Sequence, residues 1–291
     1  MKLNVVNSPK LLELKKRRRR IFSNKILLGL LGLGIIFVGL IYLSRLSVLN
    51  IQEVEVTGNK IIDIDVIQSV AEQEISGHYL WFVPKTNILF YPKNKIKKEL
   101  SNQIKKLKDV NLSIKNNQIL EVSVTERIAL YTWCRDTIDL VVGVPSGNPT
   151  TEKCFFMDDS GYIFDEAPYF SGEVYFKFYG PTDTNTESPP GSYFLKDKFD
   201  KLILLKQAIE DLKLKPIILQ KEENRDMKFL LSSKSSQPEI IFKADADFQK
   251  VAENLETAVS TEPLLSNIKN KYSSLLYIDL RYGNKVYYRF R

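Results

Sequence analysis

An uncharged apolar run near the start of the chain, ILLGLLGLGIIFVGLIYLS, lies between Lys25 and Arg45. As an α-helix rising about 1.5 Å per residue, it covers roughly 28 Å, close to the hydrocarbon thickness of a bilayer. A buried core helix would carry a polar face, and this run has none. A cleaved signal peptide has a shorter apolar region, about 7 to 15 residues, that ends in small residues. This run instead ends in Tyr42-Leu43-Ser44. We predict one uncleaved transmembrane helix over residues 26–44.

Six consecutive cations, Lys15 to Arg20, precede the apolar run and predict its orientation. Basic segments beside a span are retained in the cytoplasm. Residues 1–25 should therefore be a cytoplasmic tail that also attracts anionic lipid, and residues 45–291 should lie outside. The same cations would suit a nucleic-acid or nuclear-localisation patch. Their position next to the span favours the membrane interpretation, with no nucleic-acid partner.

The net charge of +7 belongs to the tail, because residues 1–25 carry nine Lys or Arg against one acid. The remaining chain has a charge of −1 and is nearly neutral. With 44% hydrophobic residues, it can fill real cores.

The exported part offers no credible catalytic constellation. The single histidine, His78, and two cysteines are too few for a structural zinc site, so we expect no metal and no cofactor. His78 follows Gly77 in a connector and is expected at the surface. The pair Asp158-Asp159 precedes Ser160-Gly161, which favours a turn over acid–base chemistry. A Ser-Lys hydrolase remains possible on composition alone, but no supporting motif is present.

Residues 45–128 have the pattern of an α+β unit with the order strand, helix, helix, strand, strand. Alternation of apolar residues every second position predicts strands, and recurrence every three or four positions predicts helices. The expected elements are a strand ending at Thr57-Gly58-Asn59, a helix from Asp63 to Glu74, a helix from Pro92 through Ile96, Leu100, Ile104 and Leu107, and strands at residues 110–115 and 120–125.

Residues 129–291 have the pattern of a second α+β domain. The expected elements are strands near residues 129–133, 176–179, 217–219, 228–231 and 240–242, a helix carrying Leu202, Leu205, Ile209 and Leu212, a helix carrying Phe248, Val251, Ala252, Leu255 and Val259, and a terminal strand pair. The polar segment Pro181 to Ser192 is expected to be an exposed loop.

This layout resembles the POTRA domain and C-terminal β domain of the bacterial FtsQ/DivIB cell-division proteins. The resemblance rests on V-x-V-x-G-N at Val54 to Asn59, V-T-E-R at Val124 to Arg127, the D-x-x-G-x-x-F core of CFFMDDSGYIFDE, and the terminal YIDLRYGNKVYYRF. The proline common after E-R in that family is replaced by Ile128. The resemblance implies a POTRA domain at 45–128 and a β domain at 129–291 with an extended antiparallel sheet.

The resemblance further implies a non-enzymatic scaffold at the division septum of the cell membrane. Such a scaffold would bind FtsB/DivIC-like and FtsL-like proteins through sheet edges, with peptidoglycan synthases as further candidate partners. Two alternatives stay open: a membrane-anchored extracytoplasmic hydrolase, and a POTRA-type component of protein translocation.

Cys134 and Cys154 flank a loop and end two apparent strands. Pairing of these strands as a hairpin would bring the thiols together, and an oxidising compartment would permit a disulfide. Two unpaired thiols are the alternative.

The terminal segment predicts a hairpin that turns at Tyr282-Gly283-Asn284. Its last strand alternates apolar with charged or aromatic residues and is expected at a sheet edge, open to a partner strand. Tyr277, Tyr287 and Arg289 are the predicted anchors, because aromatic and Arg side chains dominate interfaces. The remaining predicted partner-binding residues are Lys285, Val286, Tyr288 and Phe290. An ordinary core hairpin is the alternative.

Overall fold

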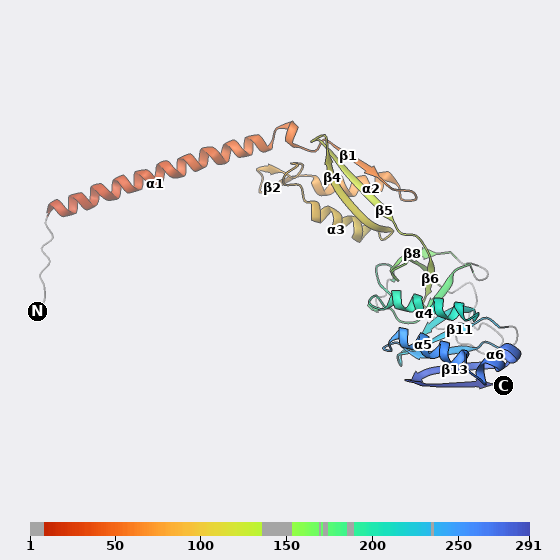
Figure 1. Cartoon of the computed structure of the whole chain (residues 1–291). Coiled ribbons are helices and arrows are strands. Elements are labelled where there is room, and N and C mark those ends of the chain that lie inside the picture. The colour runs from red at the N-terminus through yellow and green to blue at the C-terminus, as the bar shows by residue number, and fades with distance from the viewer. Residues whose placement is uncertain (1–8, 136–152, 169, 171–173, 185–188, 234–235) are drawn as a thin grey trace, which may run out of the picture. The chain divides into compact units, whose positions relative to one another are not determined.

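The computed structural model describes residues 9–135, 153–168, 170, 174–184, 189–233 and 236–291 (Figure 1). The chain forms two compact units. The first comprises Met1–Ser101 with Asp109–Thr125, and the second comprises Asn102–Lys108 with Glu126–Arg291.

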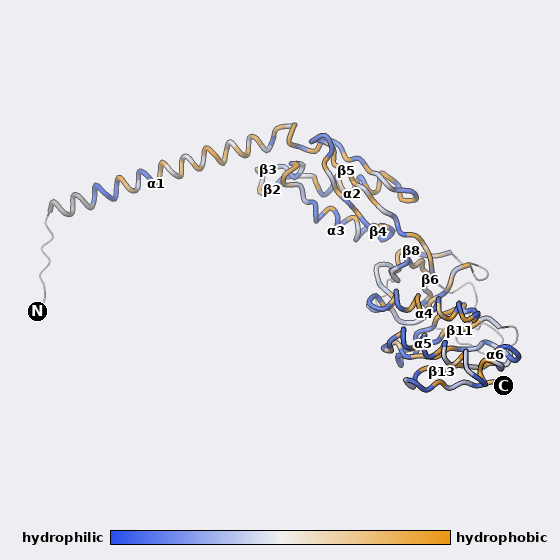
Figure 2. The backbone as a smooth tube through the Cα atoms, in the orientation of Figure 1, coloured by the Kyte–Doolittle hydropathy of each residue, from blue (hydrophilic) through white to orange (hydrophobic). Residues whose placement is uncertain are grey.

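The first unit begins with one long helix, α1 (Pro9–Ser44), which contains the apolar run and starts well before it. Its part Lys16–Ser44 is long and apolar enough to cross a membrane and buries none of its apolar window inside the protein. Figure 2 shows these hydrophobic positions along the helix. Length and composition alone fit a single membrane span or a signal sequence.

A three-stranded sheet in the order β1-β5-β4, together with two helices, forms the rest of the first unit. Strands β1 and β5 run parallel, and the connection between them contains two helices and strand β4. The elements after α1 are η1 (Ser47–Leu49), β1 (Glu53–Thr57), α2 (Ile64–Ile75), β2 (His78–Tyr79), β3 (Val83–Pro84), α3 (Lys93–Gln103), β4 (Leu107–Lys115) and β5 (Ile119–Glu126).

Local sequence signals account for these elements. The Asp63 carboxylate caps α2 by accepting a hydrogen bond from the Asp65 N–H at 3.2 Å, as its position before the helix predicts. Leu120, Val122 and Val124 of β5 are buried, which confirms the predicted alternation. Asn116 and Asn117 both have positive φ and form the turn between β4 and β5.

The predicted extent of the second helix was wrong. The helix α3 ends at Gln103, and Leu107 is the first residue of β4 instead of the last apolar position of the helix. Leu107 is buried, so its burial fits the helical spacing and a strand equally well. The Lys105-Lys106 turn, closed by the Leu107 N–H to Ile104 carbonyl bond, separates the two elements.

The second unit is built on a nine-stranded sheet in the order β14-β13-β12-β11-β10-β9-β6-β7-β8. Its strands are β6 (Tyr131–Cys134), β7 (Cys154–Met157), β8 (Ile163–Ala167), β9 (Phe176–Tyr179), β10 (Pro216–Lys221), β11 (Asp226–Leu231), β12 (Glu239–Lys243), β13 (Leu275–Tyr282) and β14 (Lys285–Phe290). Its helices are α4 (Phe199–Asp211), α5 (Phe248–Val259), α6 (Leu264–Lys271) and η2 (Tyr272–Ser274).

This sheet is mixed, and the expectation of an antiparallel sheet was wrong. The pairs β6–β9, β9–β10 and β12–β13 are parallel. Helix α4 connects β9 to β10, and α5 and α6 connect β12 to β13, so these two pairs are joined by helical crossovers. The antiparallel strands β7 and β8 connect β6 to β9.

One hydrophobic core packs the two main helices against the sheet. Phe199, Leu202, Leu205 and Ile209 of α4 and Phe248, Val251, Leu255 and Val259 of α5 all join it. On the sheet, Phe178, Phe229 and Phe242 are fully buried in the same cluster. This core fixes the positions of the strands out to the β13–β14 hairpin, where Val286, Tyr288 and Phe290 pack against it.

Candidate functional site

The nine-stranded sheet has two edges, and they differ in how far they are covered. At β8, the Ile163 N–H donates to the Ser192 carbonyl at 2.9 Å, and the Ile163 carbonyl accepts from the Gly191 N–H at 2.8 Å. A neighbouring segment therefore covers part of that edge. Within the described part of the chain, β14 pairs only with β13. Among the residues that the structure describes, no strand pairs with its outer side, which presents a row of backbone donors and acceptors.

The two faces of β14 follow the predicted alternation. Val286, Tyr288 and Phe290 are half-buried and pack against the core, whereas Lys285, Tyr287 and Arg289 are exposed. The structure thus separates the predicted binding residues into two sets. The first set holds the strand on the core, and the second set points to solvent.

The hairpin turn is held in place by the neighbouring helix. Gly283 has a φ of 65°, a left-handed conformation that suits glycine. The Asn254 side chain of α5 donates to the Gly283 carbonyl at 2.9 Å. This bond fixes the end of the hairpin to the unit and keeps β14 in position.

The exposed face of the hairpin carries an aromatic and charged patch, which we call the β14 patch: Tyr277, Tyr282, Lys285, Tyr287 and Arg289. Tyr277 lies opposite Arg289 in the β13–β14 register, and Tyr287 lies opposite Asp279. The Tyr282 and Tyr287 rings make an edge-to-face contact with centroids 5.3 Å apart. The structure therefore brings the three predicted anchors onto one face and adds Tyr282, which the sequence analysis had placed in the turn.

Beside the patch lies an ion-pair cluster that the sequence analysis missed. Arg281 pairs with Asp279 and with Asp226, each with an N–O distance of 2.6 Å. Both carboxylates are buried. Burial acts to raise the pKa of Asp279, but the hydrogen bonds and charge of Arg281 outweigh it, so this pKa lies below its ordinary value. The hydrogen bonds of Asp279, opposed by burial, raise the pKa of Arg281. Both shifts favour the charged forms of Asp279 and Arg281, and the Arg281–Asp226 pair connects β13 with β11 across β12.

A second charged group continues along the same face. Lys228 contacts Glu222 at 2.6 Å and Glu239 at 3.9 Å. Glu239 lies beside Tyr277 in the β12–β13 register. Burial raises the pKa of the Glu239 carboxyl, against the charge of Lys228. The surface beside the open edge is therefore polar and charged, which suits side chains of a protein partner better than an apolar ligand.

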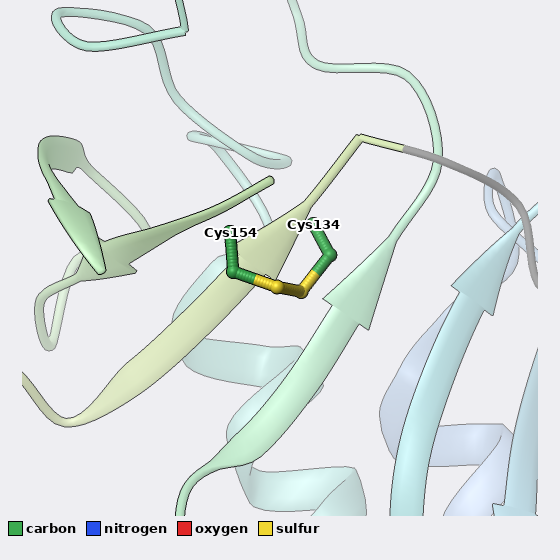
Figure 3. The surroundings of a disulfide bond; sticks show 2 residues. All are labelled: Cys134 and Cys154. Atoms are coloured by element: carbon green, nitrogen blue, oxygen red, sulfur yellow. A yellow bond between two sulfur atoms is a disulfide. The ribbon is translucent and has the colours of Figure 1, made fainter. Parts of the chain in front are cut away.

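Cys134 and Cys154 are joined by a disulfide bond, with the sulfur atoms 2.02 Å apart (Figure 3). They lie opposite each other in the antiparallel register of β6 and β7, at the inner ends of the hairpin. The segment between them lies largely outside the described residues. The bond joins β6 to β7, which lies next to the edge strand β8.

Asp158 and His78 were considered as catalytic residues from the sequence, and the structure shows what surrounds each of them. Asp158 is buried, forms an ion pair with Arg127, and accepts hydrogen bonds from the Ser160 N–H and hydroxyl and from the Tyr162 N–H. It thus organises the predicted turn. His78 lies exposed in β2. In the described part of the chain, no group of three or more His, Cys, Asp or Glu residues is arranged to hold a metal ion.

The chain matches no protein-family model and no curated protein sequence.

Proposed function

We propose that the protein is a membrane-anchored, non-enzymatic scaffold of the bacterial division septum, and that it binds FtsB/DivIC-like and FtsL-like proteins at β14. The observation that carries the proposal is the open edge of β14, flanked by the β14 patch. A strand added to such an edge gains backbone hydrogen bonds, and neighbouring side chains supply specificity. The likeness of the terminal hairpin to the FtsQ/DivIB terminus supports the choice of partner.

The proposal assigns α1 as a permanent membrane span with its basic end in the cytoplasm. Lys16 to Arg20 lie on the N-terminal side of the apolar run, which supports this orientation. The proposal also assigns residues 45–128 as a POTRA domain and residues 129–291 as the β domain, with peptidoglycan synthases as further partners. The two-helix, three-stranded composition of the first unit supports the POTRA assignment.

The anchor is tested by a reporter enzyme that folds only outside the cytoplasm, fused after Arg291. We expect an active reporter, and a chain that stays in the membrane after alkaline extraction. An inactive reporter would contradict the orientation, and extraction into the supernatant would contradict the span.

The binding site is tested by co-expressing the full chain with the FtsB/DivIC-like and FtsL-like proteins of the same organism and purifying the complex. The double substitution Tyr287→Ala with Arg289→Glu removes one exposed ring and reverses one exposed charge. We expect the affinity for the FtsB/DivIC-like partner to fall by about 100-fold or more, as it does when interface hot spots are removed.

A matched control is available on α4. Leu204→Ala with Lys201→Glu also truncates one exposed apolar side chain and reverses one exposed cation, on the helical side of the unit. It should leave binding unchanged. Retained binding by a folded Tyr287→Ala/Arg289→Glu chain would refute the site, whereas a misfolded one would favour the core-hairpin alternative.

A further inference from the structure

The hairpin formed by β2, β3 and the residues between them, His78–Pro84, presents apolar side chains to the outside of the first unit. We call it the aromatic hairpin. Leu80 is 85% exposed and Trp81 is 89% exposed, and Phe82 and Tyr79 are also exposed. Leu89 and Phe90, in the following loop, are exposed as well. Such a cluster of exposed large apolar residues marks an interaction surface.

The aromatic hairpin lies against α1. The rings of Phe82 and Phe37 form an edge-to-face contact with centroids 6.4 Å apart. Phe37 lies seven residues before Ser44, the last residue of α1, which is about 10 Å along the helix axis. The hairpin therefore reaches back beside the last two turns of the apolar helix, to a depth that a bilayer around α1 would occupy.

The end of α1 is tied to the first unit by specific hydrogen bonds. The Ser44 carbonyl accepts from the side chains of Asn87, at 3.0 Å, and Asn50, at 2.9 Å. Asn87 is buried. The Arg45 guanidinium donates to the carbonyls of Trp81 and Phe82, at 3.4 and 3.3 Å. These bonds hold the hairpin and the 86–90 loop at the level where α1 ends.

Two exposed residues between β2 and β3 have an unusual backbone conformation. Leu80 and Trp81 have φ values of 44° and 70°, in the left-handed region. This conformation is uncommon for large side chains.

From these observations we infer that the aromatic hairpin is a second membrane contact, inserted into the outer-leaflet interface beside α1. Its occupant is lipid. Trp and Tyr rings favour the headgroup level, Leu80 and Phe82 enter the upper acyl region, and Arg45 lies where lipid phosphates are found. The contact fixes the tilt and rotation of the first unit on the membrane. It rests on the span assigned to α1 above and not on the division partners.

Tryptophan fluorescence tests the inference in the full chain reconstituted into phosphatidylcholine–phosphatidylglycerol vesicles. The chain has two tryptophans, and Trp133 is buried, so the difference between the native chain and Trp81→Phe isolates the Trp81 signal. Lipids brominated near the headgroup end of their acyl chains quench rings at that depth, and aqueous iodide quenches rings in water. We expect quenching of Trp81 by brominated lipid of about two-fold or more, and weak quenching by iodide.

A Leu204→Trp reporter in the Trp81→Phe chain supplies the water-exposed reference, because Leu204 is 69% exposed on α4. It should be quenched by iodide and not by brominated lipid. Iodide quenching of Trp81 equal to that of this reporter would overturn the inference. Protection of Trp81 from both quenchers would also overturn it, since a protein surface would then cover the hairpin. Alkaline extraction of the same vesicles separates the two proposals: a chain that stays in the membrane with an unquenched Trp81 retains its anchor and loses only the hairpin contact.

Discussion

Arg127 forms an ion pair with the buried carboxylate of Asp158, and this pair joins two of the sequence motifs behind the family resemblance, V-T-E-R and D-x-x-G-x-x-F. The Arg127 guanidinium also lies over the Tyr162 ring at 3.8 Å and donates to the carbonyls of Lys105 and Leu107. One side chain therefore satisfies a carboxylate, a ring face and two backbone acceptors.

Replacing Arg127 with Ala should destabilise the second unit by about 3–5 kcal/mol, because it leaves the Asp158 carboxylate buried without its cation. Urea unfolding of the full chain in detergent, followed by tryptophan fluorescence, measures the change. Lys108→Ala is the matched control, since the Lys108–Asp159 pair is about half exposed on both sides and should contribute less than about 1 kcal/mol. Equal effects of the two substitutions would contradict the role of burial.

The Asp279 carboxylate predicts a loss of stability in acid. Its pKa is lower in the folded protein than in the unfolded chain, so its ionised form stabilises the fold above the unfolded value of about 3.9. This contribution is lost as the pH falls through the lower, folded pKa. Asp279→Asn should reduce the free energy of unfolding by about 1–3 kcal/mol at neutral pH, because Arg281 loses a charged partner. It should also flatten the dependence of that free energy on pH below about 4. Identical pH dependence in the two proteins would rule out this origin.

Gly58 of the V-x-V-x-G-N motif should not tolerate a side chain. Its φ is +88°, and an added Cβ would lie 2.2 Å from the Val124 carbonyl oxygen. Gly58→Ala should therefore lower the free energy of unfolding of the first unit by more than the roughly 1 kcal/mol that the left-handed backbone costs. Gly77 has a φ of +85°, and a Cβ added there would meet no atom within 4 Å. Gly77→Ala therefore measures the cost of the backbone conformation alone. A Gly58 effect no larger than that of Gly77 would show that the strand contact is unimportant.

Breaking the Cys134–Cys154 bond should cost about 3 kcal/mol in the chain-entropy model, because the sequence separation is 20 residues. The double substitution to Ser, compared with the native chain under non-reducing conditions, measures this cost. Thiol labelling of the denatured, unreduced protein purified from membranes checks the bond itself. Two labelled cysteines per chain would show that the bond is absent in the cell.

The periodic apolar patterns predicted most elements because each carried a local stop or start signal. Asp63 began α2, the Asn116-Asn117 pair turned the chain into β5, and Gly283 turned β13 into β14. Leu107 was assigned to the helix instead of β4, because a buried residue at that position fits both the helical period of three or four residues and the strand period of two. Helix α6 was missed, since in residues 264–271 only Leu264 is buried and most other positions are polar.

The binding face could be predicted in part, because strand alternation sorts Tyr287 and Arg289 from Tyr288 and Phe290 without knowledge of the fold. The Arg281 cluster could not be predicted, because Asp226 lies 55 residues from Arg281 in the chain and two strands away in the sheet. The direction of the strands depended on which helices act as crossovers, and periodicity alone does not specify that. The exposed aromatic hairpin at Trp81 could not be predicted either, because tertiary packing decides whether a Trp side chain is exposed.

Helix α1 does not stop at the basic run but continues through it to Pro9. Residues Lys16 to Arg20 point in successive directions about 100° apart, so their charges surround the helix as a collar. In a membrane-spanning α1, an outward pull on the exported units would draw this collar into hydrocarbon, at about 2.5–3.5 kcal/mol for each cation. The collar would then hold the chain against mechanical force in that direction, and charge-neutral replacement of Lys16 to Arg20 should let the chain be extracted under lower tension.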